Sequence, residues 1–152
     1  MTIQARYVHT NLVAKDWQKL AQFYKDVFGC IPVPPERDLA GPWVDALTAI
    51  PGVGIRGVHL RLPGHGTTGP TLEIFQYDPG HQGEDKTVNR PGFAHIAFEV
   101  DDVAAAGDAV LAGGGGSVGD LVSLEIPGAG TVTLIYARDP EGNILELQQW
   151  DR

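Results

Sequence analysis

Two segments of the chain are nearly the same, and each places a glutamate among apolar residues. Residues 72–78 read LEIFQYD and residues 145–151 read LELQQWD, so Glu73 and Glu146 hold equivalent positions. A single glutamate in a strand usually faces solvent. A duplicated one is a candidate metal ligand.

The chain also repeats a histidine. YVHTNLV at 7–13 and FAHIAFEV at 93–100 each have a histidine at the third place, which makes His9 and His95 equivalent. Neutral imidazole nitrogens and carboxylate oxygens suit Zn²⁺, Ni²⁺, Co²⁺, Fe²⁺ or Mn²⁺. Two glutamates facing each other in a cavity without a cation would repel and be poorly solvated. The two histidines and two glutamates therefore predict one divalent metal site.

Because side chains alternate along a strand, all four residues belong to faces of mixed character. The opposite faces of the same segments are purely apolar, and we expect helices to cover them. A pseudo-twofold relation between two similar halves would bring both His–Glu pairs to one centre. The apolar pairs are Val8 and Leu12, Leu72 and Ile74, Ile96 and Phe98, and Leu145 and Leu147.

The predicted elements repeat as well, in the order strand, helix and three strands. Asp16 and either Asp101 or Asp102 are expected helix N-caps, Gly29 ends the first helix, and the glycines at 113–116 end the second. The expected strands are 5–13, 55–62, 71–77, 93–100, 121–126, 131–138 and 144–150. The expected helices are 17–28, a short one near 44–49 and one running to about 112. A further strand falls in the Pro- and Gly-rich segment 31–54.

This repeat predicts a single domain, residues 1–152, built from two modules. The first module covers about 5–78 and the second about 92–151, with a polar, turn-rich linker at 79–91 between them. One helix followed by three strands in each half indicates an α+β fold class. A chain of 152 residues is long enough to bury a core of ordinary size.

Composition excludes several other classes of protein. A net charge of −8 argues against nucleic acid or an anionic membrane as a partner. No apolar run approaches the roughly 20 residues of a membrane helix, and the N-terminal residues lack a signal-peptide layout. The lone Cys30 excludes an internal disulfide, and we expect it to be a small buried residue. Cytoplasmic residence is the expectation that follows.

On these residues the chain resembles the vicinal oxygen chelate superfamily, which includes glyoxalase I, methylmalonyl-CoA epimerase, extradiol dioxygenases and fosfomycin and bleomycin resistance proteins. The resemblance implies two paired βαβββ modules that form an open, cup-shaped barrel. It places the metal ligands at His9, Glu73, His95 and Glu146. The segments that carry it are VHTNLVAKDWQKLAQFYKDVFG at 8–29, TLEIFQY at 71–77, GFAHIAFEVDD at 92–102 and RDPEGNILEL at 138–147.

The resemblance also implies a reaction. Family members chelate neighbouring oxygens of a small molecule on a divalent ion (Ni, Co, Zn, Mn or Fe) and stabilise an oxyanion. We expect a lyase or isomerase/epimerase of the glyoxalase type, with Glu146 and Glu73 as proton shuttles. The ligand set is closest to that of bacterial glyoxalase I. However, Val13 and Tyr77 stand where that enzyme usually has an arginine and an asparagine for glutathione.

Two other functions remain open at this stage. An Fe²⁺ extradiol-type dioxygenase needs only two histidines and one carboxylate, so a fourth ligand weighs against it. A metal-free drug-binding resistance protein needs no metal centre, so the intact ligand set weighs against that alternative. The resemblance further implies a homodimer, because family members commonly pair. Sites in the family are built either from one chain or from two.

The remaining polar and aromatic residues predict a substrate pocket. His59 and Arg61 share the polar face of one strand and either bind an anionic group or lie at an exposed strand edge. Aromatic residues on the mixed faces either line an apolar pocket or belong to the core. The predicted pocket residues are His59, Arg61, Phe75, Tyr77, Phe93 and Trp150.

Overall fold

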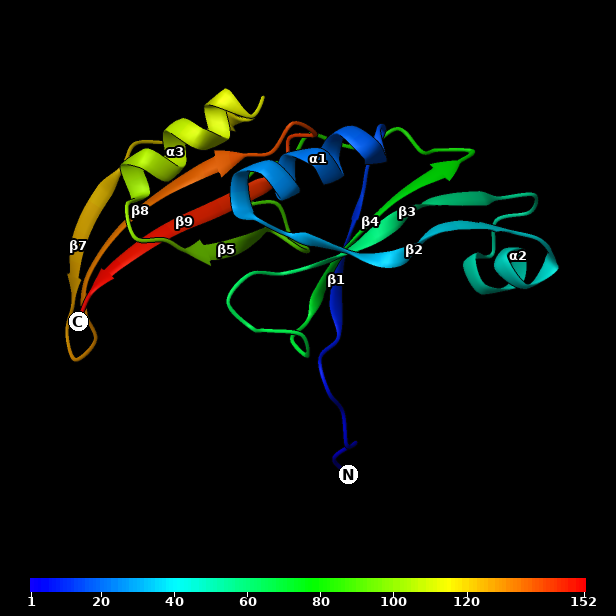
Figure 1. Ribbon diagram of the computed structural model, residues 1–152, viewed down its shortest axis with the longest axis horizontal. Coiled ribbons are helices and arrows are strands. Elements are labelled where there is room, and N and C mark those ends of the chain that lie inside the picture. The colour runs from blue at the N-terminus through cyan, green and yellow to red at the C-terminus, as the bar shows by residue number, and fades with distance from the viewer. The chain divides into compact units, whose positions relative to one another are not determined.

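The structure is a computed structural model that describes residues 1–152, and it divides into two compact units, Met1–Gln82 and Gly83–Arg152. Each unit has its own sheet and a helix that packs on it (Figure 1). Neither sheet closes into a barrel. The fold class is therefore α+β, as predicted. None of the helices has the length and apolar character needed to cross a membrane.

The first unit is a four-stranded sheet in the order β1-β4-β3-β2. Strands β1 and β4 run parallel, and the other neighbours are antiparallel. The strand that closes the unit in sequence, β4, thus lies at its centre between the first and third strands. The elements are β1 (His9–Val13), α1 (Trp17–Phe28), β2 (Ile31–Ala40), α2 (Pro42–Thr48), β3 (Gly54–Arg61) and β4 (Thr71–Asp78).

Helix α1 covers one face of this sheet. The carboxylate of Asp16 accepts a hydrogen bond from the backbone N–H of Lys19 at 3.1 Å, and Gly29 ends the helix at φ 68°, as predicted. Its apolar stripe packs on β3 and β4, where Leu60 and Leu72 are fully buried. Because side chains alternate, His59 and Arg61 of β3 and Glu73 of β4 lie on the opposite face.

The second unit repeats the arrangement. Strand β5 runs parallel to β9, which pairs with β8, and β8 in turn pairs with both β6 and β7. Asp102 is the N-cap of α3, and its side chain accepts from the N–H of Ala105 at 2.9 Å. The elements are β5 (His95–Glu99), α3 (Val103–Ala112), β6 (Gly116–Ser117), β7 (Val122–Ile126), β8 (Gly130–Arg138) and β9 (Ile144–Asp151).

Two local features set the path of the chain into β9. At Gly115 an added Cβ would lie 2.3 Å from the carbonyl oxygen of Arg138, so only glycine allows this close approach. Asp139 is buried, and its Oδ1 accepts hydrogen bonds from the N–H groups of Glu141 and Asn143, both at 2.9 Å. This turn fixes the start of the strand that carries Glu146.

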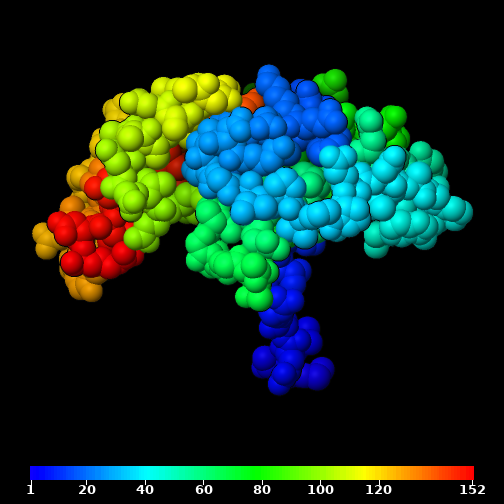
Figure 2. Space-filling view, in the orientation of Figure 1, coloured from blue at the N-terminus to red at the C-terminus, as the bar shows by residue number.

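The structure differs from the expected elements in the first unit. The Pro-rich part of 31–54 forms a ten-residue strand, β2, because it is an edge strand that pairs only with β3. Its pairing register shifts between Val33 and Arg37. The first strand begins at His9 rather than at residue 5, and residues 1–8 extend away from the body of the unit as exposed chain (Figure 2).

The burial of Cys30 predicts an unreactive thiol. The residue is 3% exposed, and burial raises the pKa of the Cys30 thiol to about 11. Because the thiolate is the reactive form, roughly 100-fold less of it exists at pH 8 than for an ordinary cysteine. Labelling with 5,5′-dithiobis(2-nitrobenzoate) at pH 8 should therefore be negligible in the native protein and rapid in guanidinium chloride. Rapid labelling of the native protein would contradict this burial.

Candidate metal centre

The two His–Glu pairs occupy the same place in the register of the two units. In the first unit His9 on β1 pairs with Thr71 on β4, and Glu73 follows two residues later. In the second unit His95 on β5 pairs with Ile144 on β9, and Glu146 again follows two residues later. Each histidine and its glutamate therefore lie on one face of two neighbouring parallel strands.

In the first unit Glu73 is the centre of a cluster. Its Oε1 lies 3.7 Å from Nε2 of His9 and accepts a hydrogen bond of 2.7 Å from Nδ2 of Asn11. Its Oε2 lies 2.6 Å from Nε2 of His59. The side chain of Glu73 is only 11% exposed, whereas that of His9 is 38% exposed. A nearly buried carboxylate is thus surrounded by nitrogen atoms from two neighbouring strands.

His59 joins this cluster because β3 pairs with β4 in a register that places it opposite Glu73. Strand β3 is paired on both sides, so His59 does not lie at an exposed strand edge. Its Nδ1 lies 3.2 Å from Oγ1 of Thr71. Burial lowers the pKa of His59, the carboxylate of Glu73 opposes this effect, and Arg37 and His9 lower it further. Nitrogens of His9 and His59 and an oxygen of Glu73 all lie within 4.8 Å of one another.

In the second unit the pair is closer but has fewer neighbours. Nε2 of His95 lies 2.9 Å from Oε2 of Glu146, whose side chain is 15% exposed. Gln148, on the same strand, donates from Nε2 to Oε1 of Glu146 at 3.0 Å. The indole N–H of Trp150 donates in turn to Oε1 of Gln148. The ring of Tyr136 lies 5.2 Å from that of His95.

The two units differ at the positions around the glutamates. Asn11, which donates to Glu73, corresponds to Ala97, which has no donor. The positions opposite the glutamates are His59 in the first unit and Tyr136 in the second. Alternation along β1 places His9 and Asn11 on one face, which a strand pattern alone predicts. The pairing of His59 with Glu73 has no such local signal, because it depends on the register of β3.

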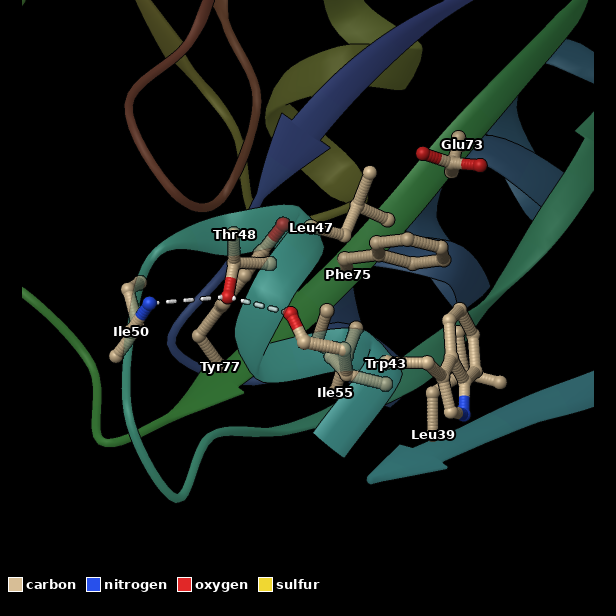
Figure 3. Close-up of a pocket in the computed structure, with 10 residues that line it drawn as sticks. Leu39, Trp43, Leu47, Thr48, Ile50, Ile55, Glu73, Phe75 and Tyr77 are labelled. Carbon is tan, nitrogen blue, oxygen red and sulfur yellow. Dashed lines mark hydrogen bonds between the residues drawn. The ribbon is translucent and has the colours of Figure 1, made fainter. Parts of the chain in front are cut away.

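A cavity of about 530 Å³ adjoins Glu73 in the first unit (Figure 3). Glu73, Phe75 and Tyr77 follow one another along β4 and form one wall, with the carboxylate at one end. Helix α2 forms another wall, and Glu73 is the only charged residue in the lining. The other lining residues are Leu39, Trp43, Val44, Leu47, Thr48, Ile50 and Ile55.

The remaining predicted pocket residues do not line this cavity. Arg61 shares a face of β3 with His59, and its register partner on β4 is Thr71. In the second unit Phe93 is fully exposed ahead of β5, and Trp150 has Arg152 over its ring at 5.0 Å. The structure therefore places two of the six, Phe75 and Tyr77, beside a predicted metal ligand in a cavity, and a third, His59, in the cluster itself.

The donor atoms fit a divalent cation of the transition series. Imidazole nitrogens and carboxylate oxygens bind such ions at about 2.0–2.2 Å, so neighbouring ligand atoms on one ion lie about 3.0–3.5 Å apart. The His–Glu separations of 3.7 Å in the first unit and 2.9 Å in the second are close to this range. Small side-chain movements within each unit would bring its histidine nitrogen and glutamate oxygen to the separation of two ligands on one ion. The convergence of the two pairs on one ion remains a prediction.

A family model, a relative and a solved structure that are similar to this chain all point to one superfamily. A family model described as Glyoxalase/Bleomycin resistance protein/Dioxygenase superfamily matches residues 6–147. A probable lactoylglutathione lyase of Vibrio parahaemolyticus is 27% identical over 146 residues, which are 95% of this chain and 90% of the relative. A crystal structure of a glyoxalase family protein from Bacillus cereus matches with a TM-score of 0.81 at 18% identity, covering 98% of this chain and 96% of that one.

A further similar structure contains a metal. It is the fosfomycin resistance protein FosX of Listeria monocytogenes, complexed with Mn(II) and sulfate ion. Its TM-score is 0.55 at 15% identity, and the match covers 99% of this chain and 95% of that one. At this level of identity the likeness shows a shared fold.

Removal of Glu73 should weaken metal binding. Loss of a partner that merely orients a ligand typically lowers metal affinity about 10–100-fold, so Glu73→Ala should lower it by at least about 100-fold. Metal content by mass spectrometry, after loading and dialysis, measures the effect. Glu36→Ala, which removes an exposed carboxylate of the same unit, is the matched control and should keep full occupancy. Full occupancy in Glu73→Ala would show that Glu73 is not a ligand.

Proposed function

We propose that this chain, which belongs to the Glyoxalase/Bleomycin resistance protein/Dioxygenase superfamily, is a metal-dependent lyase or isomerase of the glyoxalase type. The reaction would move a proton next to a carbonyl group of a small molecule. The observation that carries the proposal is the identical register of the two His–Glu pairs in two units of the same topology. The name of the Vibrio relative, probable lactoylglutathione lyase, supports the same reaction class.

His9, Glu73, His95 and Glu146 would hold the ion. Bound there, a divalent cation would supply a Lewis acid that polarises a substrate carbonyl and favours loss of the neighbouring proton. The protein groups must then hold the substrate and accept the proton. Each glutamate already lies beside a histidine in its own unit, so the ligand groups are positioned before any ion binds.

The hydrogen bonds around the two glutamates suggest that Glu73 and Glu146 have different roles in the proposed reaction. Glu73 is held by Asn11, whose amide comes from a neighbouring strand. Glu146 has Ala97 at that position, and its one amide donor, Gln148, comes from its own strand rather than from a neighbouring one. We therefore assign a fixed ligand role to Glu73. Glu146 is the proton acceptor, which takes the proton onto a carboxylate oxygen and returns it to the same or the adjacent carbon.

The cavity beside Glu73 indicates the kind of substrate. Apart from Glu73, its lining is apolar or uncharged, and it has no cationic side chain that would bind a carboxylate. Tyr77, at the position where glyoxalase I usually has a glutathione-binding asparagine, is part of that lining. We infer that the part of the substrate bound there is apolar and uncharged. This favours a substrate other than a glutathione conjugate.

Glu146→Gln should lower turnover at least about 100-fold, because a positioned general base typically contributes that much or more. The substrates to screen are 2-hydroxy and 2-oxo carbonyl compounds and methylglyoxal hemithioacetals of glutathione and of apolar thiols. Exchange of the C–H proton in D₂O, followed by NMR on the metal-loaded protein, is the readout. Glu125→Gln, on exposed β7 of the same unit, is the matched control and should keep wild-type exchange.

Two results of this screen would contradict the proposal. Equal exchange rates in Glu146→Gln and wild type would remove the assigned role of Glu146. Oxygen uptake with catechols in the Fe²⁺-loaded protein, without proton exchange on any carbonyl substrate, would favour the dioxygenase alternative instead.

The cavity itself can be tested with a neutral apolar probe, N-phenyl-1-naphthylamine, whose fluorescence rises on binding. Leu47→Lys places a charge at the mouth of the cavity, and burying that charge is unfavourable. The Kd of the probe should rise at least about tenfold. The same change at Leu111, an exposed leucine of α3 in the second unit, should leave the Kd unchanged. Equal effects of both variants would mean that the probe does not bind in this cavity.

A further inference from the structure

We propose that the first unit alone holds a divalent cation, with His59 as a ligand beside His9 and Glu73. His59 would then be a ligand in addition to the four predicted from the sequence. The catalytic role of this ion rests on the proposed function. The binding of the ion does not depend on that function. It follows from three side chains on three neighbouring strands, β1, β4 and β3.

The distances within the cluster suit one ion. Two ligands about 2.1 Å from an ion lie about 3.0 Å apart at right angles and about 3.4 Å apart in a tetrahedral arrangement. Nε2 of His9 lies 3.7 Å from Oε1 of Glu73, and Nε2 of His59 lies 2.6 Å from Oε2 of Glu73. One nitrogen of each histidine and one oxygen of Glu73 lie within 4.8 Å of one another. The three groups would have to draw closer together to bind one ion, with Glu73 binding through one or both of its oxygens.

His59 also has the outer hydrogen bond that metal-binding histidines usually make. Its Nδ1 lies 3.2 Å from the hydroxyl of Thr71, which can donate or accept. With Nδ1–H donating to Thr71, the lone pair of Nε2 is free to face an ion. Glu73 is also oriented by a hydrogen bond, because Asn11 donates to its Oε1 at 2.7 Å. Both ligands are therefore oriented by side chains that would not touch the ion.

A simpler explanation is that His59 only compensates the buried carboxylate. The second unit argues against a purely structural role, since it builds the same strand pairing around Glu146 with Tyr136 at the equivalent position. Thr71 likewise corresponds to Ile144, which has no hydroxyl. The first unit thus carries a ligand and its orienting group where the second unit has neither. Two histidines and one carboxylate would leave further positions on the ion open for substrate oxygens or other ligands.

The test measures whether the chain still binds Zn²⁺ after the predicted ligands of the second unit have been removed. Zn²⁺ titrations of the full-length chain against a chromophoric chelator give the affinity, and Co²⁺ absorption reports the ligand geometry. In His95→Ala/Glu146→Gln, we expect one Zn²⁺ to bind tightly. Adding His59→Gln to this background should weaken binding at least about 100-fold. His81→Gln, which removes an exposed histidine of the same unit, is the control and should have no effect.

A second variant keeps all three ligands. Thr71→Val preserves the shape of the side chain but removes the hydroxyl beside Nδ1 of His59, so Zn²⁺ affinity should fall about tenfold. Circular dichroism and thermal unfolding verify that each variant is folded. Unchanged affinity in Thr71→Val would overturn the orienting role of the hydroxyl.

Two outcomes would overturn the proposal itself. If His95→Ala/Glu146→Gln binds no Zn²⁺ while the wild type does, the first unit is not a site by itself, although the proposed function stands. If His59→Gln binds as tightly as its parent, His59 is not a ligand. Failure of the proposed function would be seen differently, as a chain that binds Zn²⁺ through His59 but exchanges no substrate proton.

Discussion

The first unit depends on how it accommodates one nearly buried carboxylate. An ionised carboxylate removed from water is stable only when other groups replace the lost hydration. Asn11 and His59 do this for Glu73, and they come from the strands on its two sides. The polar face of this sheet is therefore organised around Glu73, while the opposite face is organised by burial of apolar residues under α1. A hydrogen bond to a charged group typically contributes about 1.5–3 kcal/mol.

Parallel pairing of the first and last strand of each unit is the second constraint. A crossover connection is needed to bring two strands into parallel register, and the intervening helix and strands provide it. In both units this places a histidine and a glutamate on one face, two positions apart in register. Two residues that are more than 50 positions apart in sequence thereby become neighbours. The same pairing explains why the closing strand of each unit carries the duplicated glutamate.

Much of this arrangement was predictable from the sequence because it rests on periodicity and repetition. The helices at 17–28 and after Asp102 follow from their caps and apolar spacing, and the closing strands from alternation. The equivalence of the His–Glu pairs follows from the repeat alone. The matching family model confirms the resemblance that these segments carried.

The features that could not be predicted depend on pairing rather than on local pattern. Strand β2 has three prolines, and its strand character depends on lying at a sheet edge. The contact between His59 and Glu73 depends on the antiparallel register of β3 and β4, which a shift of one residue would abolish. The cavity depends on where α2 lies against β4, which a short Pro- and Gly-rich segment does not specify.

The difference between the two units means that their two glutamates are not interchangeable. Around Glu73 the neighbouring strands supply an amide and a second imidazole, Asn11 and His59, whereas the same positions around Glu146 carry a methyl group and a phenol, Ala97 and Tyr136. The near-identity of segments 72–78 and 145–151 therefore hides a difference that lies entirely in the strands beside them. Exchanging the two segments within the chain would place each glutamate among partners that it does not have now.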